Sequence, residues 1–260
     1  MIGNEELTNI ARMGGMLPHQ QEKHYVQTIV LKSLFSNYSN KLIFKGGTSL
    51  WFFHGLRRFS EDLDFTAKID EINTKNITTQ VNNDLALMGL ENGITISEMK
   101  NSLSFRVGAK GPLFQGERGS SCFVSVDISF REKVILPYET HEYDPPYTEI
   151  GPFSVVTMDL KEISAEKIRA IMTREKARDV YDLFFLFRKG QIPDLVLINE
   201  KLSYYEKKFN YKEFEKELKK KKDIWDNELS SLIFGKYSAF KEVSDEILGT
   251  AKMLRNESDI

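Results

Sequence analysis

The sequence predicts an α+β fold, with strands and helices mixed over the first 155 residues and helices alone after that. Short apolar or alternating runs, bounded by glycine, proline and polar residues, recur between residues 42 and 157 and are typical of strands. Apolar residues at helical spacing dominate before residue 39 and again from residue 159 onward. A chain of 260 residues, 41% hydrophobic and 28% charged, can bury one large core or two small ones. We therefore expect one domain over residues 1–155 and a helical domain over residues 156–260.

The elements of the first domain follow from local patterns. Pro18 interrupts the first helical stretch, because its ring cannot continue a helix. Gly55 ends a short helix that Thr48 or Ser49 caps. The expected elements are helical residues 5–38, a strand at 42–44, a short helix at 50–54, a strand at 62–65, a helix from 72 to 90 that ends at Gly93, strands at 94–96 and 102–107, a glycine-containing loop at 108–121, a strand at 122–130, a proline- and tyrosine-rich loop at 143–147, and a last strand at 153–157.

Two helices open the second domain. Asp159, with Glu162 three positions later, predicts a capping box, in which each side chain bonds the backbone N–H of the other residue. Thr173 is expected to cap the next helix. On that helix Arg178 lies one turn from Asp182 and can pair with it, so the charged residues here also fit an ordinary solvated face.

Residues 45–50 read Lys-Gly-Gly-Thr-Ser-Leu, between the first strand and the short helix. Gly46 and Gly47 can adopt backbone angles closed to other residues and let a phosphate approach the main chain. Free amides and the dipole at the helix start favour an anion, and the hydroxyl of Thr48 or Ser49 adds a donor. The segment is a candidate phosphate-binding turn.

Two carboxylates follow at close range. In Asp62-Leu63-Asp64-Phe65 acids and apolar residues alternate, so Asp62 and Asp64 share one strand face while Leu63 and Phe65 pack inward. Carboxylates about 6–7 Å apart repel each other unless a cation lies between them. Oxygen-only ligands of this kind select Mg²⁺ or Mn²⁺. A phosphate-binding turn and a metal site this close together indicate the binding of a metal-complexed nucleoside triphosphate (NTP).

Asp127 lies in the middle of a run rich in β-branched and aromatic residues, which predicts a central strand. An acid there costs several kcal/mol unless a cation or donor accompanies it. The alternative is an edge-strand acid that faces water.

The combination Gly46-Gly47-Thr48-Ser49 with Asp62-x-Asp64 resembles the signature of the polymerase-β-like nucleotidyltransferase superfamily. The resemblance implies a mixed sheet flanked by helices. It also implies that Asp127 completes the metal site and takes a proton from the attacking hydroxyl. The usual Gly-Ser of the superfamily is Gly47-Thr48-Ser49 here, which leaves open which hydroxyl meets the phosphate.

Residues 161–170 and 174–183 look like the later motifs of the AbiEii family, the nucleotidyltransferase-like toxins of bacterial toxin–antitoxin and phage-abortive systems. By that resemblance Lys167 contacts the nucleotide phosphates, Asp179 belongs to the active site, and the helical domain contributes to the active-site cleft. Asp179 is otherwise explained as an ion pair with neighbouring Arg or Lys residues. The family implies the 3′ end of tRNA as acceptor and an antitoxin encoded nearby. The last seventy residues resemble nothing we can name.

The sequence offers a second feature that suits RNA. Lysines and aromatic residues alternate over residues 204–222, which could form a phosphate-tracking surface with stacking platforms. An amphipathic helix with solvated lysines explains the same pattern. The residues are Lys207, Lys208, Lys212 and 219–222, with Tyr204, Tyr205, Phe209, Tyr211 and Phe214.

Composition bears on disulfides, membrane segments and cellular location. Cys122 is the single cysteine, so an intrachain disulfide framework is excluded. With no apolar run near twenty residues and no charged-then-apolar start, we expect no membrane segment and a cytoplasmic protein. Three other functions fit the same residues: nucleotidyl transfer to a protein or a small molecule, kinase-like transfer of the γ-phosphate, and binding of nucleotide or RNA without turnover.

Overall fold

The computed structural model describes residues 1–39, 41–68, 73–99 and 101–254. Contacts divide the chain into two compact units. The first unit contains Met1–Gly55, Phe59–Lys133 and Tyr138–Thr157, and the second contains Leu56–Arg58, Val134–Pro137 and the chain from Met158 onward. Each unit has its own buried apolar core.

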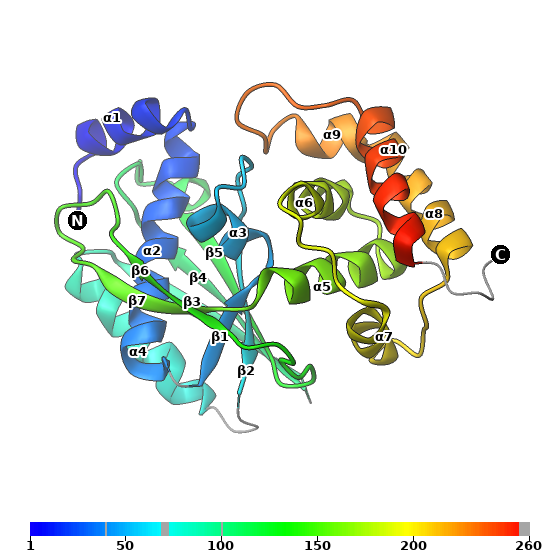
Figure 1. Ribbon diagram of the computed structural model, residues 1–260. Helices are drawn as coiled ribbons and strands as arrows, with labels where there is room; N and C mark the ends of the chain where they lie inside the picture. Colours follow the sequence, from blue (N-terminus) through cyan, green and yellow to red (C-terminus); the bar gives the residue numbers. More distant parts are fainter. Residues whose placement is uncertain (40, 69–72, 100, 255–260) are drawn as a thin grey trace. The chain divides into compact units, whose positions relative to one another are not determined.

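The strands of the first unit form one sheet in the order β3-β4-β5-β2-β1-β7-β6 (Figure 1). Neighbours are antiparallel except for the β2–β5 and β1–β7 pairs, which are parallel. The sheet is therefore mixed, as predicted. Its strands are β1 (Leu42–Lys45), β2 (Asp62–Ala67), β3 (Asn92–Met99), β4 (Ser102–Ala109), β5 (Cys122–Ser129), β6 (Glu139–Tyr143) and β7 (Phe153–Thr157).

Helices cover one face of this sheet. Side chains of α2 and α4 share a single core with the inward-facing residues of the strands, which explains the alternation of buried and half-buried positions along β2, β4 and β5. Pro18 is the first residue of α2, a position where the missing N–H costs nothing. The helices are α1 (Asn4–Gly14), α2 (Pro18–Tyr38), α3 (Gly46–His54) and α4 (Thr74–Leu87).

A buried hydrogen-bond network ties α2 to the segment before β7. His24 Nδ1 lies 2.6 Å from the hydroxyl of Tyr147, and its Nε2 lies 3.1 Å from the hydroxyl of Tyr143. The imidazole stacks on Phe52 at a centroid distance of 4.7 Å. Burial lowers the pKa of His24 to about 3, so the ring is neutral at physiological pH.

We expect this histidine to make the first unit less stable in mild acid. The unfolded state takes up a proton near pH 6.5 and the folded state does not, so stability falls as pH drops below 6.5, by about 2 kcal/mol between pH 6.5 and 5. Trp51 lies in the first unit and Trp225 in the second, so a Trp225→Phe background reports on the first unit alone. Urea unfolding followed by Trp51 fluorescence should show this slope, and a His24→Gln variant should lose it. Equal slopes in both proteins would contradict the expectation.

The second unit is helical, with Trp225, Phe214 and Leu218 among its fully buried side chains. Apolar residues of its first two helices, including Ile168 and Val180, lie in this core. No helix in the described ranges of either unit is long and apolar enough to cross a bilayer. The helices are α5 (Leu160–Thr173), α6 (Ala177–Arg188), α7 (Leu195–Ser203), α8 (Tyr211–Lys220), α9 (Trp225–Leu229) and α10 (Phe240–Ala251) (Figure 1).

Two short segments from the middle of the chain belong to the second unit. Arg57 accepts a backbone hydrogen bond from Phe234 at 3.1 Å, and Arg58 forms an isolated β-bridge with Ile233. The amides of Ile135 and Leu136 donate to the Glu162 carboxylate at 2.9 and 2.8 Å. That carboxylate also accepts from Lys201 and is fully buried.

Several predicted boundaries were wrong for identifiable reasons. Helix α3 begins at Gly46, not at residue 50, because Gly46 has a φ of 75° and turns the chain directly into the helix. Helix α4 ends at Leu87, and Gly89 with a φ of 79° follows it, whereas Gly93 lies within β3. The predicted start of that helix, residue 72, lies outside the described residues.

Other differences come from contacts that no local pattern shows. Strand β6 was missed because its sequence, Glu-Thr-His-Glu-Tyr, lacks apolar alternation and it forms only by pairing with β7. Thr173 ends α5 and donates to the Arg169 carbonyl, so it does not cap α6. Asp159 does cap α5, but Glu162 completes no capping box because its carboxylate binds residues 135–136 and Lys201 instead.

Candidate functional site

The candidate phosphate-binding turn is the first turn of α3. Lys45 is its N-cap residue, and the Lys45 side chain makes no capping hydrogen bond to the amides that follow. Thr48 Oγ1 donates to the Asp62 carbonyl and lies 2.7 Å from Ser60 Oγ, so it fastens this turn to the start of β2. The hydroxyl of Ser49 is buried and has no hydrogen-bond partner among the described residues.

Gly46 brings this turn against an aspartate. A Cβ on Gly46 would lie 2.6 Å from Asp64 Oδ2, so the carboxylate occupies the space that any other side chain would need. Lys45 pairs with Asp64 across β1 and β2, which agrees with this close approach. The turn and the carboxylate are in direct contact.

Three aspartates lie on one face of the sheet. Leu63 and Phe65 are fully buried in the core, so the alternation turns Asp62 and Asp64 to the opposite face, as predicted. The parallel pairing of β2 with β5 places Asp127 directly beside Asp64. Because β5 has a neighbour on each side, the edge-strand explanation of Asp127 is wrong.

Sequence reasoning missed three residues at this site. Ser104 on β4 lies opposite Asp127 and donates to its Oδ1, which leaves Oδ2 for other ligands. Lys45 makes a buried ion pair, at 2.7 Å, with Glu132, which follows β5. Lys45 adjoins the glycine motif and could have been suspected, but Glu132 and Ser104 carry no local signal.

The donor chemistry of the three aspartates determines which metal ion they can hold. Within the described ranges, no three His, Cys, Asp or Glu side chains converge closely enough to form a complete site by themselves. Magnesium usually takes only one or two carboxylates and completes its shell with water and substrate phosphates. The oxygen-only set of Asp62, Asp64 and Asp127 fits Mg²⁺ or Mn²⁺ that shares its ligands with a bound phosphate.

The second unit holds a cluster of five charged side chains, of which all but Arg174 are buried. Arg58 binds both carboxylate oxygens of Asp182, at 2.6 and 2.7 Å, and Lys167 reaches the same carboxylate at 2.7 Å. Lys167 also donates to Asp179 at 2.9 Å, and Arg174 binds both oxygens of Asp179. Lys167 therefore joins two aspartates that each hold an arginine.

These charges set the protonation states. Burial by itself raises the pKa of Asp179, but Lys167 and Arg174 outweigh it and hold that pKa well below its ordinary value. Burial likewise opposes ionisation of Asp182, and Arg58 with Lys167 lowers its pKa below the usual range. Both aspartates are therefore ionised at neutral pH.

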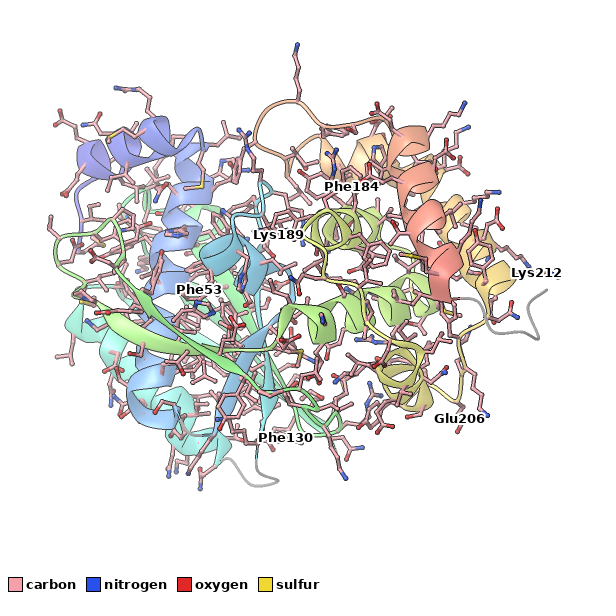
Figure 2. All side chains as sticks on the ribbon, in the orientation of Figure 1. Phe53, Phe130, Phe184, Lys189, Glu206 and Lys212 are labelled. Atoms are coloured by element: carbon pink, nitrogen blue, oxygen red, sulfur yellow. The ribbon has the colours of Figure 1, made fainter. Side chains whose placement is uncertain are left out.

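Two sequence interpretations of charged residues were wrong. Arg178 pairs with Glu228 rather than with Asp182. Most of the stacking platforms suggested for residues 204–222 do not exist, because Phe209, Tyr211 and Phe214 are buried in the core. Helix α8 is an amphipathic helix with lysines at its surface, and Figure 2 shows Lys212 extending away from it. Ion pairs with glutamates partly neutralise the positive charge of Lys207, which precedes α8, and of Lys219 and Lys220 within it.

Residues 29–246, from α2 to α10, match the family model described as nucleotidyl transferase AbiEii toxin, type IV toxin–antitoxin system. The chain belongs to the AbiEii family. It is thus a nucleotidyltransferase toxin of a type IV system, and the resemblance seen in the sequence is confirmed. No curated protein matches this chain.

Solved structures support the fold of this AbiEii protein. MenT4, a nucleotidyltransferase toxin from Mycobacterium tuberculosis, superposes with a TM-score of 0.63 at 18% identity over 100% of this chain and 92% of MenT4. JHP933 from Helicobacter pylori gives a TM-score of 0.57 at 20% identity over 90% of this chain and 91% of its own. At such identities the likeness concerns the fold alone.

The contact between Gly46 and Asp64 leads to a matched pair of variants. Gly46 and Gly55 both have positive φ, 75° and 79°, so alanine at either position is strained by about 1–2 kcal/mol. Only at Gly46 does the new Cβ also strike a carboxylate, since nothing lies within 4 Å of it at Gly55. We expect similar losses in melting temperature, but a fall in nucleotidyl transfer of about tenfold or more for Gly46→Ala alone. Equal activity in the two variants would contradict a role for this contact.

Proposed function

We propose that this AbiEii protein transfers a nucleoside monophosphate from an NTP to the 3′-terminal hydroxyl of a tRNA and releases pyrophosphate. The observation that supports it most is the contact between the first turn of α3 and Asp64, on a sheet face shared with Asp62 and Asp127. The choice of tRNA rests on the resemblance to AbiEii toxins, for which it is the expected acceptor. A cytoplasmic location and an antitoxin encoded nearby belong to the same proposal.

The triphosphate would be held at the start of α3. The amides of Gly46, Gly47 and Thr48 in the first turn are donors, and the helix dipole favours an anion there. A buried hydroxyl without a partner costs about 1–3 kcal/mol, which a phosphate oxygen at Ser49 would relieve. By the resemblance to AbiEii toxins, Lys167 would contact the nucleotide phosphates.

The three aspartates would bind the metal ion and accept the proton of the acceptor hydroxyl. Asp62 and Asp64, with Asp127, would hold Mg²⁺, which supplies charge neutralisation and a more acidic acceptor hydroxyl. Asp127 accepts the proton of that hydroxyl at the oxygen not bonded to Ser104. The acceptor oxygen bonds to the α-phosphorus, the bond to the β-phosphate bridging oxygen breaks, and the electron pair leaves with pyrophosphate. Asp179 holds the Lys167 ammonium in place through their hydrogen bond of 2.9 Å.

Labelled nucleotides test the proposal directly. The protein is incubated with total tRNA, Mg²⁺ and each NTP in turn, labelled at either the α- or the γ-phosphate. We expect α-label, and no γ-label, on the tRNA, and loss of the product after mild 3′-end trimming.

Other outcomes select the alternatives. A γ-label on any acceptor indicates a kinase, and an α-label on protein or on a small molecule moves the acceptor away from RNA. Binding of NTP with no label transferred to any acceptor would overturn the proposed enzyme function in favour of a binding module.

A further inference from the structure

The sheet face that carries the aspartates continues over β4 and β5 as a surface of small polar residues. Positions that alternate with the buried core residues are exposed or half-buried along both strands. They are Ser102, Ser104, Arg106 and Gly108 on β4, and Phe123, Ser125, Asp127 and Ser129 on β5. Arg106 and Phe123 are the large side chains of this face that the site described above leaves unused.

Arg106 and Phe123 form a stacked pair. The guanidinium carbon of Arg106 lies 4.2 Å from the centroid of the Phe123 ring. Phe123 is 39% exposed, and no carboxylate in the described part of the chain forms an ion pair with Arg106. A cation without a counter-ion, held on an exposed aromatic ring, is available to an anionic ligand.

Gly108 allows this arrangement. It lies directly across from Phe123, and a Cβ at Gly108 would approach the ring to 2.9 Å. Any larger residue would therefore push the ring away from β4. The pair is thus positioned by the strand itself, at a fixed place on the sheet.

The pair of Arg106 and Phe123 lies on the same sheet face as Asp127, which receives the acceptor hydroxyl in the proposed reaction. Phe123 and Asp127 are on the same face of β5, four residues or about 13 Å apart. Arg106 is paired with Ser125 and Ser104 with Asp127, so the backbone of Arg106 lies opposite the position midway between Phe123 and Asp127. A small acceptor at Asp127 would not reach the pair, whereas the last few nucleotides of a single strand would.

We propose that Arg106 and Phe123 bind the single-stranded segment of an RNA acceptor just before the terminal hydroxyl that Asp127 receives. A base stacks on the ring or on the guanidinium plane, and Arg106 contacts a backbone phosphate. The serines beside them supply hydroxyls for phosphate or ribose oxygens. This proposal rests on the proposed function and names the part of the protein that selects an RNA end.

Three variants and one control test it with the full-length protein. Phe123→Leu removes the stacking surface, and Arg106→Gln removes the charge. Gly108→Ala keeps the phenylalanine but displaces its ring. Lys68→Gln is the control, because Lys68 also lies on an aromatic ring, that of Tyr138 at 3.7 Å, but follows the far end of β2. Melting temperatures identify any variant that fails to fold.

We expect each of the three variants to raise the KM for tRNA about tenfold, with kcat and the KM for NTP within about twofold of the parent. Arg106→Gln should also reduce the slope of log affinity against log salt by about 0.7, the value for one phosphate contact to a single strand. A structural effect alone would not change that slope. Parent-like KM for tRNA in the folded variants would overturn the proposal and leave the proposed function intact.

Binding without turnover separates the two ideas. Anisotropy of a labelled single-stranded octaribonucleotide is measured with an Asp64→Ala protein and with the same protein carrying Phe123→Leu. Tighter binding by the first supports the RNA platform even if tRNA receives no nucleotide. Equal binding by both would overturn it.

Discussion

Replacing Asp64 with alanine is expected to lower nucleotidyl transfer at least about 100-fold, by analogy with the loss of one charge-stabilising group. Asp64 touches the first turn of α3 and lies beside Asp127, so in the proposed mechanism its loss would separate the triphosphate from the metal. Asp64→Asn should do nearly the same, since the amide keeps the shape and loses the charge. The rate is measured with α-labelled NTP, Mg²⁺ and tRNA.

Stability distinguishes a site defect from misfolding. Asp62 and Asp64 repel each other without a cation, so removing one of them should leave the melting temperature in EDTA unchanged or slightly higher. Mg²⁺ with NTP should raise the melting temperature of the parent protein and have less effect on the variant. Glu98→Ala serves as control, because Glu98 is an exposed acid on the edge strand β3. Substantial turnover by the Asp62→Asn, Asp64→Asn double variant would refute the assigned site.

Replacing Asp182 with alanine is expected to destabilise the second unit by about 3–5 kcal/mol. The change leaves Arg58 and Lys167 buried with too little negative charge, since Asp182 accepts hydrogen bonds from both. Urea unfolding in a Trp51→Phe background, where Trp225 is the reporter, measures the loss in this unit. In the variant, the buried Arg58 guanidinium has lost the carboxylate with which it pairs.

A double variant tests that explanation. Arg58→Met with Asp182→Leu removes both charges and fills the volume, so most of the lost stability should return. Glu215→Ala breaks an exposed pair with Lys219 on α8 and should have no measurable effect. If the double variant is as unstable as the single one, the unpaired charge is not the cause.

The buried aspartates of the same cluster make the stability of the second unit depend on pH in acid. The pKa values of Asp179 and Asp182 are lowered in the folded state, so their contribution is complete above pH 4, near the pKa of an unfolded aspartate, and is lost as pH falls further.

Much of the fold was accessible from local patterns. Alternation in β2 correctly placed Asp62 and Asp64 on one face, and Phe153–Thr157 was predicted with the bounds the structure has. Gly55 ends α3 with a φ of 79°, as a glycine at that position should. These features depend on interactions within a few residues, which the sequence displays directly.

Residues that act through distant partners escaped prediction. Glu132 is 87 positions from Lys45, and Asp182 is 124 from Arg58, yet both pairs are buried and closely bonded. For Arg178 and for residues 204–222 the sequence left two explanations open, because it does not show which side of a helix the core takes.

From the amino-acid order alone came the family, the paired aspartates and the glycine turn, because each is a short pattern with its own backbone consequence. Tertiary structure alone decided which strand lies beside β2, that Gly46 touches Asp64, and that Arg106 rests on Phe123. Strand order and side-chain contacts depend on packing between segments far apart in the chain, and a local sequence pattern does not show which segments pack together.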